Sequence, residues 1–320
     1  MIYHDVDRLG ISISALACGT WGVGAAGWGE INDDESIESI RYMTDHGVNL
    51  VDTAPVYGLG HSEEIVGKAL EGIRDKVFLV SKCGITRRKA TGFGSGGPVR
   101  DSSGPMIIRQ VEESLERLKT DRLDVLLIHW PDVNTPFAET ADALKQLKKE
   151  GKIRFSGICN FDEEQIKEFY ELGALDFTQY HFSMVENKWT GILHDYHDKG
   201  VATMAYGPLG GGILSGAFRS IPDFAKDDMR LNFYPFFKEP IFSKCQELLK
   251  VMDEIAAIHS VDVSQVAVNW ACTHPAITTA LCGTSKIRHA RSNVEALDWS
   301  LSEEERKILD EASSKVTTQE

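Results

Sequence analysis

The sequence lacks a long hydrophobic run, and it also lacks a surplus of positive charge. No segment approaches the ~20 uninterrupted apolar residues that a membrane-spanning helix needs. The opening MIYHDVDRLG has no basic stretch followed by an apolar run, as a secretory signal would. The formal net charge of −14 argues against nucleic acid or an anionic membrane as the main partner. We therefore expect no nucleic-acid partner and no membrane partner, and the sequence leaves the oligomeric state open.

Cysteines are few and scattered, and none of the six belongs to a Cys-x-x-Cys pair. This usage favours a reducing, cytoplasmic compartment over a disulfide framework. Cys83 follows Lys82, but a cationic neighbour alone does not make a thiol reactive, so we interpret it as a buried structural residue. His194 and His197 have helical spacing, yet no Cys or carboxylate pattern completes a ligand set, and we predict no metal site.

Short apolar runs alternate with amphipathic helical patterns through most of the 320 residues, as at Ile37, Ile40 and Met43. The predicted strands are Ala15–Gly19, Val48–Thr53, Val77–Lys82, Leu123–His129, Ile153–Ile158, Phe177–Gln179, Val201–Tyr206 and Thr278–Cys282. The predicted helices are Asp33–His46, Ser62–Glu71, Pro105–Leu118, Phe137–Glu150, Asp162–Leu172, Trp189–Lys199, Phe242–His259 and Lys286–Ala296, with Asp33 and Asp162 as cap residues.

Alternation of this kind fits either a doubly wound sheet or a closed barrel. A doubly wound sheet would place a glycine-rich fingerprint directly after the first strand. Here Trp21 interrupts the glycines, and a loop continues to Asn32 before the helix. We predict an α/β fold, an eightfold parallel (β/α)8 TIM barrel in one domain over residues 1–320. A hairpin within residues 1–13 precedes the barrel, and an extra helix, Ser302–Ser313, follows it.

In the stretch VNLVDTAPVYGLG, residues 48–60, Asp52 lies at the carboxyl end of a predicted buried strand, bracketed by the apolar or β-branched residues Val48, Leu50, Val51 and Thr53. A buried carboxylate is costly unless a cation or several hydrogen-bond donors meet it. The next strand ends in Lys82, and the strand after that ends in His129. Because barrel active sites form at the carboxyl ends of the strands, we expect these side chains and Tyr57 to meet at one mouth.

These four residues suit carbonyl chemistry. A Lys82–Asp52 pair resolves the desolvation cost, and an ammonium near the Tyr57 hydroxyl should lower its pKa from ~10 toward working pH. Tyr57 then acts as a general acid, while His129 donates a hydrogen bond to the same oxygen. No side chain supplies a hydride, so a nicotinamide must do so.

Two further loops fit the phosphates of such a cofactor. Strand seven opens into GPLGGGILSG, and strand eight leads through Gly283, Thr284 and Ser285 into a helix that carries Lys286 and Arg288. In barrels, phosphate commonly binds in the loops after strands seven and eight, at a helix N-terminus.

With these motifs in place, the chain resembles the aldo-keto reductases from about residue 8 to 300. DTAPVYG followed by HSEEIVGKAL, LDVLLIHWP, KKEGKIRFSGICNF and YGPLGGGILSG are all similar to passages of that family, and bacterial reductases of small aldehydes such as methylglyoxal are the nearest likeness. Asp52, Tyr57, Lys82 and His129 match the family's catalytic tetrad.

The resemblance implies roles for further residues. It places Asn160 and Gln179 on the nicotinamide carboxamide and Tyr206 on the nicotinamide ring. It places Trp21 and Trp130, with Tyr57 and His129, around the substrate. The full predicted cofactor site is Thr20, Trp21, Asn160, Gln179, Tyr206, Gly207, Leu209, Gly211, Gly283, Thr284, Ser285, Lys286, His289, Ser292 and Asn293.

The chain departs from the family pattern at several of these positions. Cys159 stands where many members have Ser, and Ala217 stands where Lys is common, which leaves Arg219 or Arg230 as phosphate partners. Gly283 and His289 replace a Lys and an Arg that grip the 2′-phosphate in some NADPH-specific members. Since Lys286 and Arg288 could substitute, we predict that NADP(H) is preferred, with NAD(H) as the alternative.

The predicted function is an NAD(P)H-dependent oxidoreductase that interconverts aldehydes, ketones or sugars with alcohols. One alternative is a cofactor-binding regulatory subunit with slow residual reductase activity. Another is a barrel isomerase that forms a Schiff base at Lys82, which the Asp-Tyr-His surroundings disfavour. Two long loops, residues 84–104 and 208–240, leave the substrate undecided: the first carries Arg87 and Arg88, and the second is rich in aromatic residues.

Overall fold

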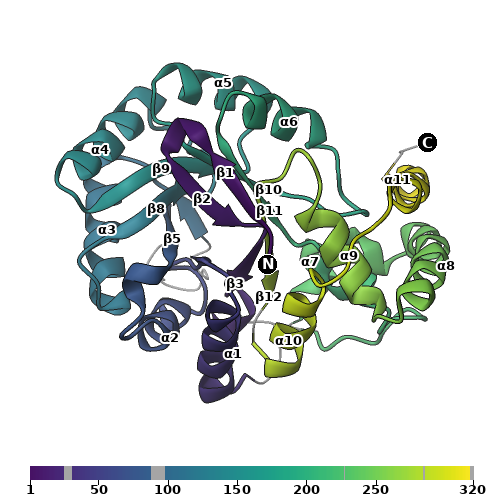
Figure 1. Ribbon diagram of the computed structural model, residues 1–320. Helices are drawn as coiled ribbons and strands as arrows, with labels where there is room; N and C mark the ends of the chain where they lie inside the picture. The colour runs from purple at the N-terminus through teal and green to yellow at the C-terminus, as the bar shows by residue number, and fades with distance from the viewer. Residues whose placement is uncertain (25–30, 88–97, 227, 284, 318–320) are drawn as a thin grey trace.

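The computed structural model describes residues 1–24, 31–87, 98–226, 228–283 and 285–317. Within these ranges, eight parallel strands form a closed barrel surrounded by helices (Figure 1). The barrel closes where β12 pairs with β3, with Gly283 opposite Gly19. In order around the barrel, the strands are β3 (Leu16–Gly19), β4 (Leu50–Asp52), β5 (Phe78–Cys83), β8 (Leu123–Ile128), β9 (Ile153–Cys159), β10 (Phe177–His181), β11 (Ala202–Tyr206) and β12 (Thr279–Gly283). The predicted TIM barrel is confirmed.

Helices follow the strands at the predicted places, with ends that differ from the prediction by a few residues. The longer helices are α1 (Asp33–Asp45), α2 (His61–Ala69), α3 (Gly104–Leu118), α4 (Phe137–Lys149), α5 (Glu163–Glu171), α6 (Thr190–Asp198), α8 (Ile241–His259), α9 (Val263–Cys272), α10 (Ile287–Glu295) and α11 (Glu303–Thr317). The short helix α7 (Arg230–Phe233) lies in the loop after β11.

Two helix starts test the cap assignments. Asp162 caps α5 as predicted, because its side chain accepts the Gln165 N–H in a capping box. The cap of α1 was predicted one residue too late. Asn32, not Asp33, accepts the Glu35 N–H, and Asp33 is the first helical residue.

Helix α9 is absent from the sequence prediction. We assigned Phe242–His259 to the seventh barrel unit, but the structure packs α9 against β12 and α10, and packs α8 against α11. The barrel therefore has two added helices, α8 and α11, instead of one. The sequence pattern concealed α9 because every residue from Gln265 to Cys272 is buried, so the segment has no solvent-exposed face to mark it as an outer barrel helix.

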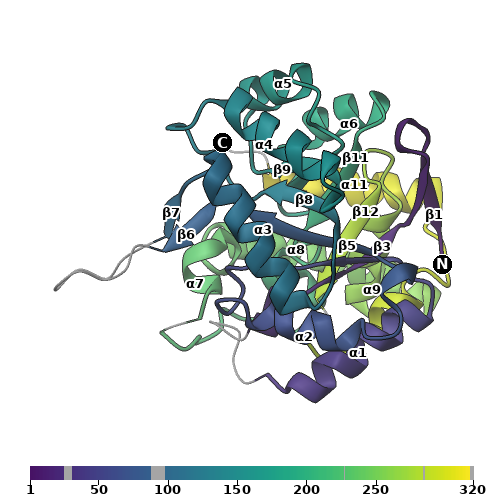
Figure 2. The ribbon, with the colours of Figure 1, turned by 90° about the vertical axis from the view of Figure 1, so that its left-hand side faces the viewer.

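The hairpin of β1 (Tyr3–Val6) and β2 (Ile11–Ser14) lies at one end of the barrel, as predicted. Its residues Val6 and Ile13 join the apolar cluster inside the barrel, which also contains Leu50, Val125 and Phe177. A second hairpin, β6 (Ile85–Arg87) with β7 (Pro98–Arg100), lies at the opposite end (Figure 2). The apolar cluster thus fills the barrel, and the β1–β2 hairpin covers one of its ends. The opposite end, where the strands have their carboxyl ends, is left for chemistry.

Within the described residues, no helix has both the length and the apolar character needed to cross a membrane.

Candidate active site

Three adjacent strands bring the predicted tetrad together. Asp52 is the last residue of β4, Lys82 lies in β5, and His129 directly follows β8. Tyr57 lies in the loop after β4. Asp52 and Lys82 are buried, whereas Tyr57 and His129 remain partly accessible. The charged pair is thus buried beside two groups that can reach a bound molecule.

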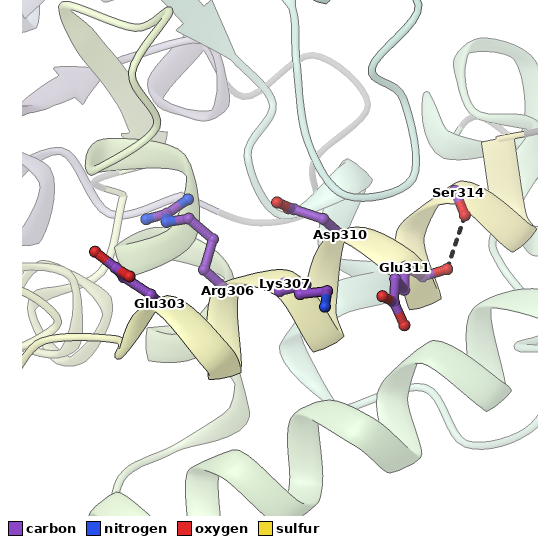
Figure 3. A pocket seen from close by; sticks show the side chains of 6 residues that line it. All are labelled: Glu303, Arg306, Lys307, Asp310, Glu311 and Ser314. Atoms are coloured by element: carbon purple, nitrogen blue, oxygen red, sulfur yellow. Dashed lines mark hydrogen bonds between the residues drawn. The ribbon is translucent and has the colours of Figure 1, made fainter.

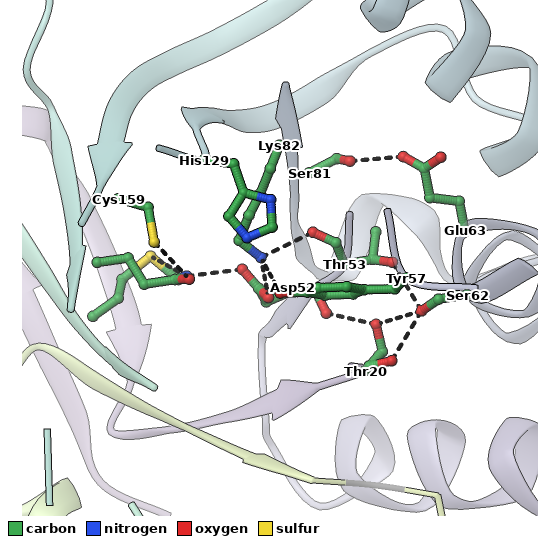
Figure 4. A network of polar contacts seen from close by, with 12 residues as sticks. Thr20, Asp52, Thr53, Tyr57, Ser62, Glu63, Ser81, Lys82, His129 and Cys159 are labelled. Atoms are coloured by element: carbon green, nitrogen blue, oxygen red, sulfur yellow. Dashed lines mark hydrogen bonds and ion pairs between the residues drawn. The ribbon is translucent and has the colours of Figure 1, made fainter. Parts of the chain in front are cut away.

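The Lys82 ammonium is the centre of this arrangement (Figure 4). Its Nζ donates to Asp52 Oδ1 at 2.6 Å, to the Thr53 carbonyl at 3.0 Å and to the Tyr57 hydroxyl at 3.1 Å. An ammonium has three donors, and all three are used. The buried cation is therefore fully hydrogen-bonded, and one of its bonds leads to the Tyr57 oxygen.

Aromatic rings fix the Tyr57 side chain. The His129 ring stands nearly perpendicular to it, with centroids 5.9 Å apart, and Trp21 stacks on it at 6.2 Å. The next residue, Gly58, has φ +63°, and a Cβ built there would lie 2.3 Å from the Gly24 carbonyl oxygen. Only glycine fits this close approach, so Gly58 helps to set the path of the Tyr57 loop.

The protonation states differ from the sequence prediction at one point. We expected Lys82 to lower the pKa of Tyr57 below its ordinary value, but burial outweighs Lys82 and raises the Tyr57 pKa to about 12. Burial acts to lower the pKa of Lys82, yet Asp52 and Tyr57 raise it above its ordinary value. Burial and the Lys82 charge hold the His129 pKa well below its ordinary value. Near neutral pH the site therefore contains a phenol, an ammonium and a neutral imidazole.

The residues predicted for the nicotinamide lie beside this tetrad. Gln179 Nε2 donates to Asp52 Oδ2 at 2.9 Å. Asn160 Nδ2 donates to the His129 carbonyl at 3.2 Å, and Asn160 Oδ1 accepts from the Tyr206 hydroxyl at 2.9 Å. The structure therefore brings Asn160, Gln179 and Tyr206 to the same mouth as the tetrad. Cys159 is buried behind them, with Sγ 3.1 Å from Asn160 Nδ2.

Thr20 occupies a different environment from the one predicted. Its side chain is completely buried, and its hydroxyl donates to the Asp52 carbonyl at 2.8 Å. Ser62 donates to the same hydroxyl, which links β3, β4 and α2. Thr20 thus supports the strand end that carries Asp52, and no part of its side chain is available to a cofactor here.

The loop after β11 has the backbone geometry of a phosphate-binding turn. Gly207, Gly210, Gly211 and Gly212 all have positive φ, and Leu209 precedes the 3-10 helix Gly210–Ser215. Consecutive turns of this kind can direct several N–H groups toward an anion. The guanidinium groups proposed as phosphate partners are already paired. Arg219 binds both Asp253 oxygens, and Arg230 binds Asp228.

The loop after β12 leads into α10. Gly283 ends the strand, and its carbonyl accepts from Asn293 Nδ2 at 3.1 Å. Lys286 caps α10, and Ser285 lies near Gly22 of the loop after β3. Ser292 accepts from Gln265 across the neighbouring helix, and His289 is exposed. Thr284 lies outside the described residues. The first N–H of α10, that of Ile287, is donated to Glu35 Oε1 at 3.2 Å, and Lys286 and Arg288 lie in the same segment.

The residues predicted to wall the substrate pocket lie beyond the carboxyl ends of β3 and β8, and their role there stays a prediction. Trp21 contacts both Tyr57 and the edge of Phe233, which comes from the loop after β11. Trp130 is covered by the Arg100 guanidinium, 5.0 Å from its ring centroid. Of the aromatic residues in loop 208–240, Tyr234, Phe236 and Phe237 are buried, whereas Phe233 is exposed beside Trp21. The Arg88 position lies outside the described residues.

Sequence reasoning missed the buried support behind Lys82. Glu63 of α2 is completely buried. It accepts from Ser81 Oγ at 2.7 Å and from Arg117 Nε at 2.6 Å (Figure 4 shows the Ser81 contact). Glu63 lies in HSEEIVGKAL, but its role was not visible because a Glu in an amphipathic helix normally faces solvent.

A separate surface hollow lies on α11, lined by Glu303, Arg306, Lys307, Asp310, Glu311 and Ser314 (Figure 3). All six residues come from one face of a single outer helix, and none belongs to the tetrad. In the described part of the chain, no group of three His, Cys, Asp or Glu side chains is arranged to hold a metal ion.

Fold and site together describe a TIM-barrel oxidoreductase, and comparison with known families agrees. The profile of the Aldo/keto reductase family matches residues 15–314, and the chain belongs to this family. It is an enzyme of the NAD(P)H-dependent, carbonyl-reducing class, with a substrate that these comparisons leave open.

Individual relatives show how far the likeness extends. The chain is 35% identical to aldo-keto reductase YhdN of Bacillus subtilis (strain 168), over 97% of this chain and 92% of the relative. It is 32% identical to the NADH-specific methylglyoxal reductase of Escherichia coli (strain K12), over 94% of this chain and 95% of the relative. The structure of the glycerol dehydrogenase AKR11B4 from Gluconobacter oxydans matches with a TM-score of 0.87 at 34% identity, covering 98% of this chain and 95% of that one. An aldo/keto reductase from Klebsiella pneumoniae, in complex with NADP and acetate, matches with a TM-score of 0.72 at 27% identity, covering 97% and 94%.

Proposed function

We propose that this protein reduces small aldehydes, ketones or keto sugars to alcohols, with Tyr57 as the general acid. The observation that carries the proposal is the Lys82 ammonium, which bonds Asp52 and the Tyr57 hydroxyl at once. Such an arrangement keeps the Tyr57 oxygen next to a fixed positive charge. The names of two relatives, a methylglyoxal reductase and a glycerol dehydrogenase, support small oxygenated substrates.

A reduced nicotinamide held by Asn160, Gln179 and Tyr206 would supply the hydride that the carbonyl carbon needs. Tyr57 then donates its proton to the carbonyl oxygen as negative charge develops there. The phenolate left behind is stabilised by Lys82, whose charge Asp52 balances. The neutral His129 imidazole is placed to donate a hydrogen bond to the same oxygen and to orient the carbonyl. Buried Asp52 and Lys82 need not move during the reaction.

Two further parts of the proposal concern the cofactor and the compartment. We propose that Asn160, Gln179 and Tyr206 bind the nicotinamide, and that the loops after β11 and β12 bind the phosphates. The preference for NADP(H) expected from Lys286 and Arg288 stays a prediction, and a cytoplasmic location stays one too.

A substrate panel tests this proposal. Purified protein should be assayed with methylglyoxal, other short aldehydes, dihydroxyacetone and keto sugars, and with glycerol and polyols in reverse, by the absorbance of the reduced nicotinamide. We expect turnover with at least one short aldehyde or ketone. A protein that binds nicotinamide dinucleotide tightly yet turns over none of these compounds would support the regulatory alternative and contradict the proposal.

A further inference from the structure

The base of the β6–β7 hairpin is tied to the end of β5, one of the strands that carry the tetrad. Gly84, which directly follows β5, accepts the Asp101 N–H on its carbonyl at 3.0 Å and donates its own N–H to Gln110 Oε1 at 2.8 Å. Gln110 Nε2 donates to the Ile85 carbonyl at 2.7 Å, and Ile85 is the register partner of Arg100. The backbone of Arg100 is therefore held at the mouth end of the barrel (Figure 2).

The Arg100 side chain covers the residue that follows His129. Its guanidinium carbon lies 5.0 Å from the Trp130 ring centroid, and Nη1 donates to the Pro131 carbonyl at 3.2 Å. The His129 ring in turn stands against the Tyr57 ring, with centroids 5.9 Å apart. A positive charge thus lies against the residue next to the imidazole that, in the proposed mechanism, orients the carbonyl.

No carboxylate of the described residues forms an ion pair with Arg100, which is exposed. The neighbouring Asp101 accepts from the Ser103 N–H at 3.1 Å and from Ser103 Oγ at 2.7 Å on one oxygen. Asp132 is buried, and its oxygens accept hydrogen bonds from neutral groups of Ser102, Asn134 and Thr135. A guanidinium has five N–H donors, and a single one of them donates to a described protein group here, so the rest of the fork is available to a ligand.

The charge of the whole chain opposes the approach of an anion. The formal net charge is −14, whereas Lys82 and Asp52 balance one another at the reacting groups and His129 is neutral. Arg100 adds a positive charge at this mouth that no described carboxylate pairs. A cover for the Trp130 ring is the competing role of Arg100, and that role would give the site no preference for the charge of a substrate.

We propose that Arg100 binds an oxyanion, a carboxylate or a phosphate, at the end of the substrate remote from the reacting carbonyl. The planar guanidinium fork matches both groups and can donate two parallel hydrogen bonds to either. This role rests on the proposed function and on the prediction that Trp130 walls the substrate pocket. Short aldehydes and ketones with an anionic tail are then the favoured substrate class, ahead of uncharged aldehydes and sugars.

Matched substrate pairs isolate the charge of the tail. Succinic semialdehyde is compared with butanal to test a carboxylate, and dihydroxyacetone phosphate with dihydroxyacetone to test a phosphate. For each compound, kcat and KM are measured with saturating reduced nicotinamide, at low and at moderate salt. Arg100→Gln removes the charge, and Arg100→Lys keeps the charge without the fork. Arg109→Gln is the matched control, because Arg109 is an exposed arginine of α3 that already pairs with Glu113.

The quantity to follow is kcat/KM for the anionic compound divided by kcat/KM for its uncharged partner, because a loss of folded protein cancels from this ratio. We expect a wild-type ratio of at least ~10 for one of the pairs. Arg100→Gln should lower that ratio by ~10-fold through KM, and Arg100→Lys should lower it less. Moderate salt should lower the wild-type ratio, since the guanidinium is exposed. Arg109→Gln should leave it within ~2-fold of wild type.

Two results would overturn this role of Arg100. A wild-type ratio near one for both pairs, or a ratio that Arg100→Gln leaves unchanged, would show that Arg100 only covers Trp130, and the proposed function would stand because the uncharged compounds are reduced. Turnover of none of these compounds would also contradict the role of Arg100, and the wider substrate panel would then decide the proposed function.

Discussion

Lys82 Nζ lies 3.1 Å from the Tyr57 hydroxyl, and the same ammonium is 2.6 Å from Asp52. The ion pair is buried, while the phenol reaches the accessible mouth. Burial raises the pKa of Tyr57, and Lys82 opposes that rise without overcoming it. In the mechanism we propose, Lys82 holds the proton donor and stabilises the phenolate formed after proton transfer, and Tyr57 starts the reaction in its protonated form.

Replacing the cation should damage both activity and stability. In Lys82→Met, we expect kcat to fall by ~10²–10⁴-fold, the usual range for loss of general acid–base assistance. The free energy of unfolding should fall by ~3–5 kcal/mol, because Asp52 would be left buried without its cation. Steady-state kinetics and urea unfolding measure the two effects. Adding Asp52→Asn should recover part of the stability but none of the activity; a double variant less stable than Lys82→Met would contradict the buried-pair account.

The pH dependence should differ between the two reaction directions. Reduction needs the Tyr57 phenol, and with a pKa of about 12 the group stays protonated through neutral and moderately alkaline pH. Oxidation needs the phenolate, so its rate should rise with pH over the same range. Because the His129 pKa is well below its ordinary value, the imidazole stays neutral just below neutral pH, and kcat for reduction should not fall there. Profiles of kcat against pH in both directions check this. A fall in kcat for reduction between neutral pH and pH 9 that disappears in Tyr57→Phe would contradict it.

The buried Glu63 should make the stability of the protein depend on Arg117, its paired cation, away from the mouth of the barrel. Arg117→Met removes the cation bound to a completely buried carboxylate. We expect unfolding free energy to fall by ~3 kcal/mol. Arg109→Met is the control, because Arg109 forms an exposed pair with Glu113 on the same helix and should lose less than ~1 kcal/mol. Equal losses in the two variants, measured by urea unfolding, would show that Glu63 does not depend on Arg117.

A change at Gly58 should affect catalysis only through the backbone path of the Tyr57 loop. In Gly58→Ala the new methyl would meet the Gly24 carbonyl, so the Tyr57 loop must shift, and kcat should fall by at least ~10-fold while nucleotide binding persists. Gly72→Ala is the matched control: it also has positive φ, +80°, but nothing lies within 4 Å of its added Cβ. It should lose some stability and keep wild-type kcat. A kcat for Gly58→Ala equal to that of Gly72→Ala would exclude the steric explanation.

Much of the barrel and the grouping of the tetrad could be predicted from the sequence, because strand length, helical periodicity and the placement of polar residues at strand ends are local properties. Other features depend on packing that no local pattern reports. Helix α9 lacks a solvent-exposed face, the Tyr57 pKa is raised by burial in the folded chain, and Glu63 pairs with Arg117 from the next helix.

Glu35 illustrates the same limit. Its carboxylate accepts the Ile287 N–H at the start of α10, although 252 positions separate the two residues, and the closure of the barrel through β12 and β3 brings them together.

The most direct test of the account is Tyr57→Phe, which removes one hydroxyl and leaves the ring. Single-turnover hydride transfer should be followed with enzyme in excess of reduced nicotinamide, together with the dissociation constant of the cofactor. We predict that the transfer rate falls by at least ~10²-fold while the dissociation constant changes by less than ~3-fold, because the hydroxyl serves the carbonyl oxygen and not the nucleotide. A variant that transfers hydride at nearly the wild-type rate would contradict the assignment of Tyr57 as the acid.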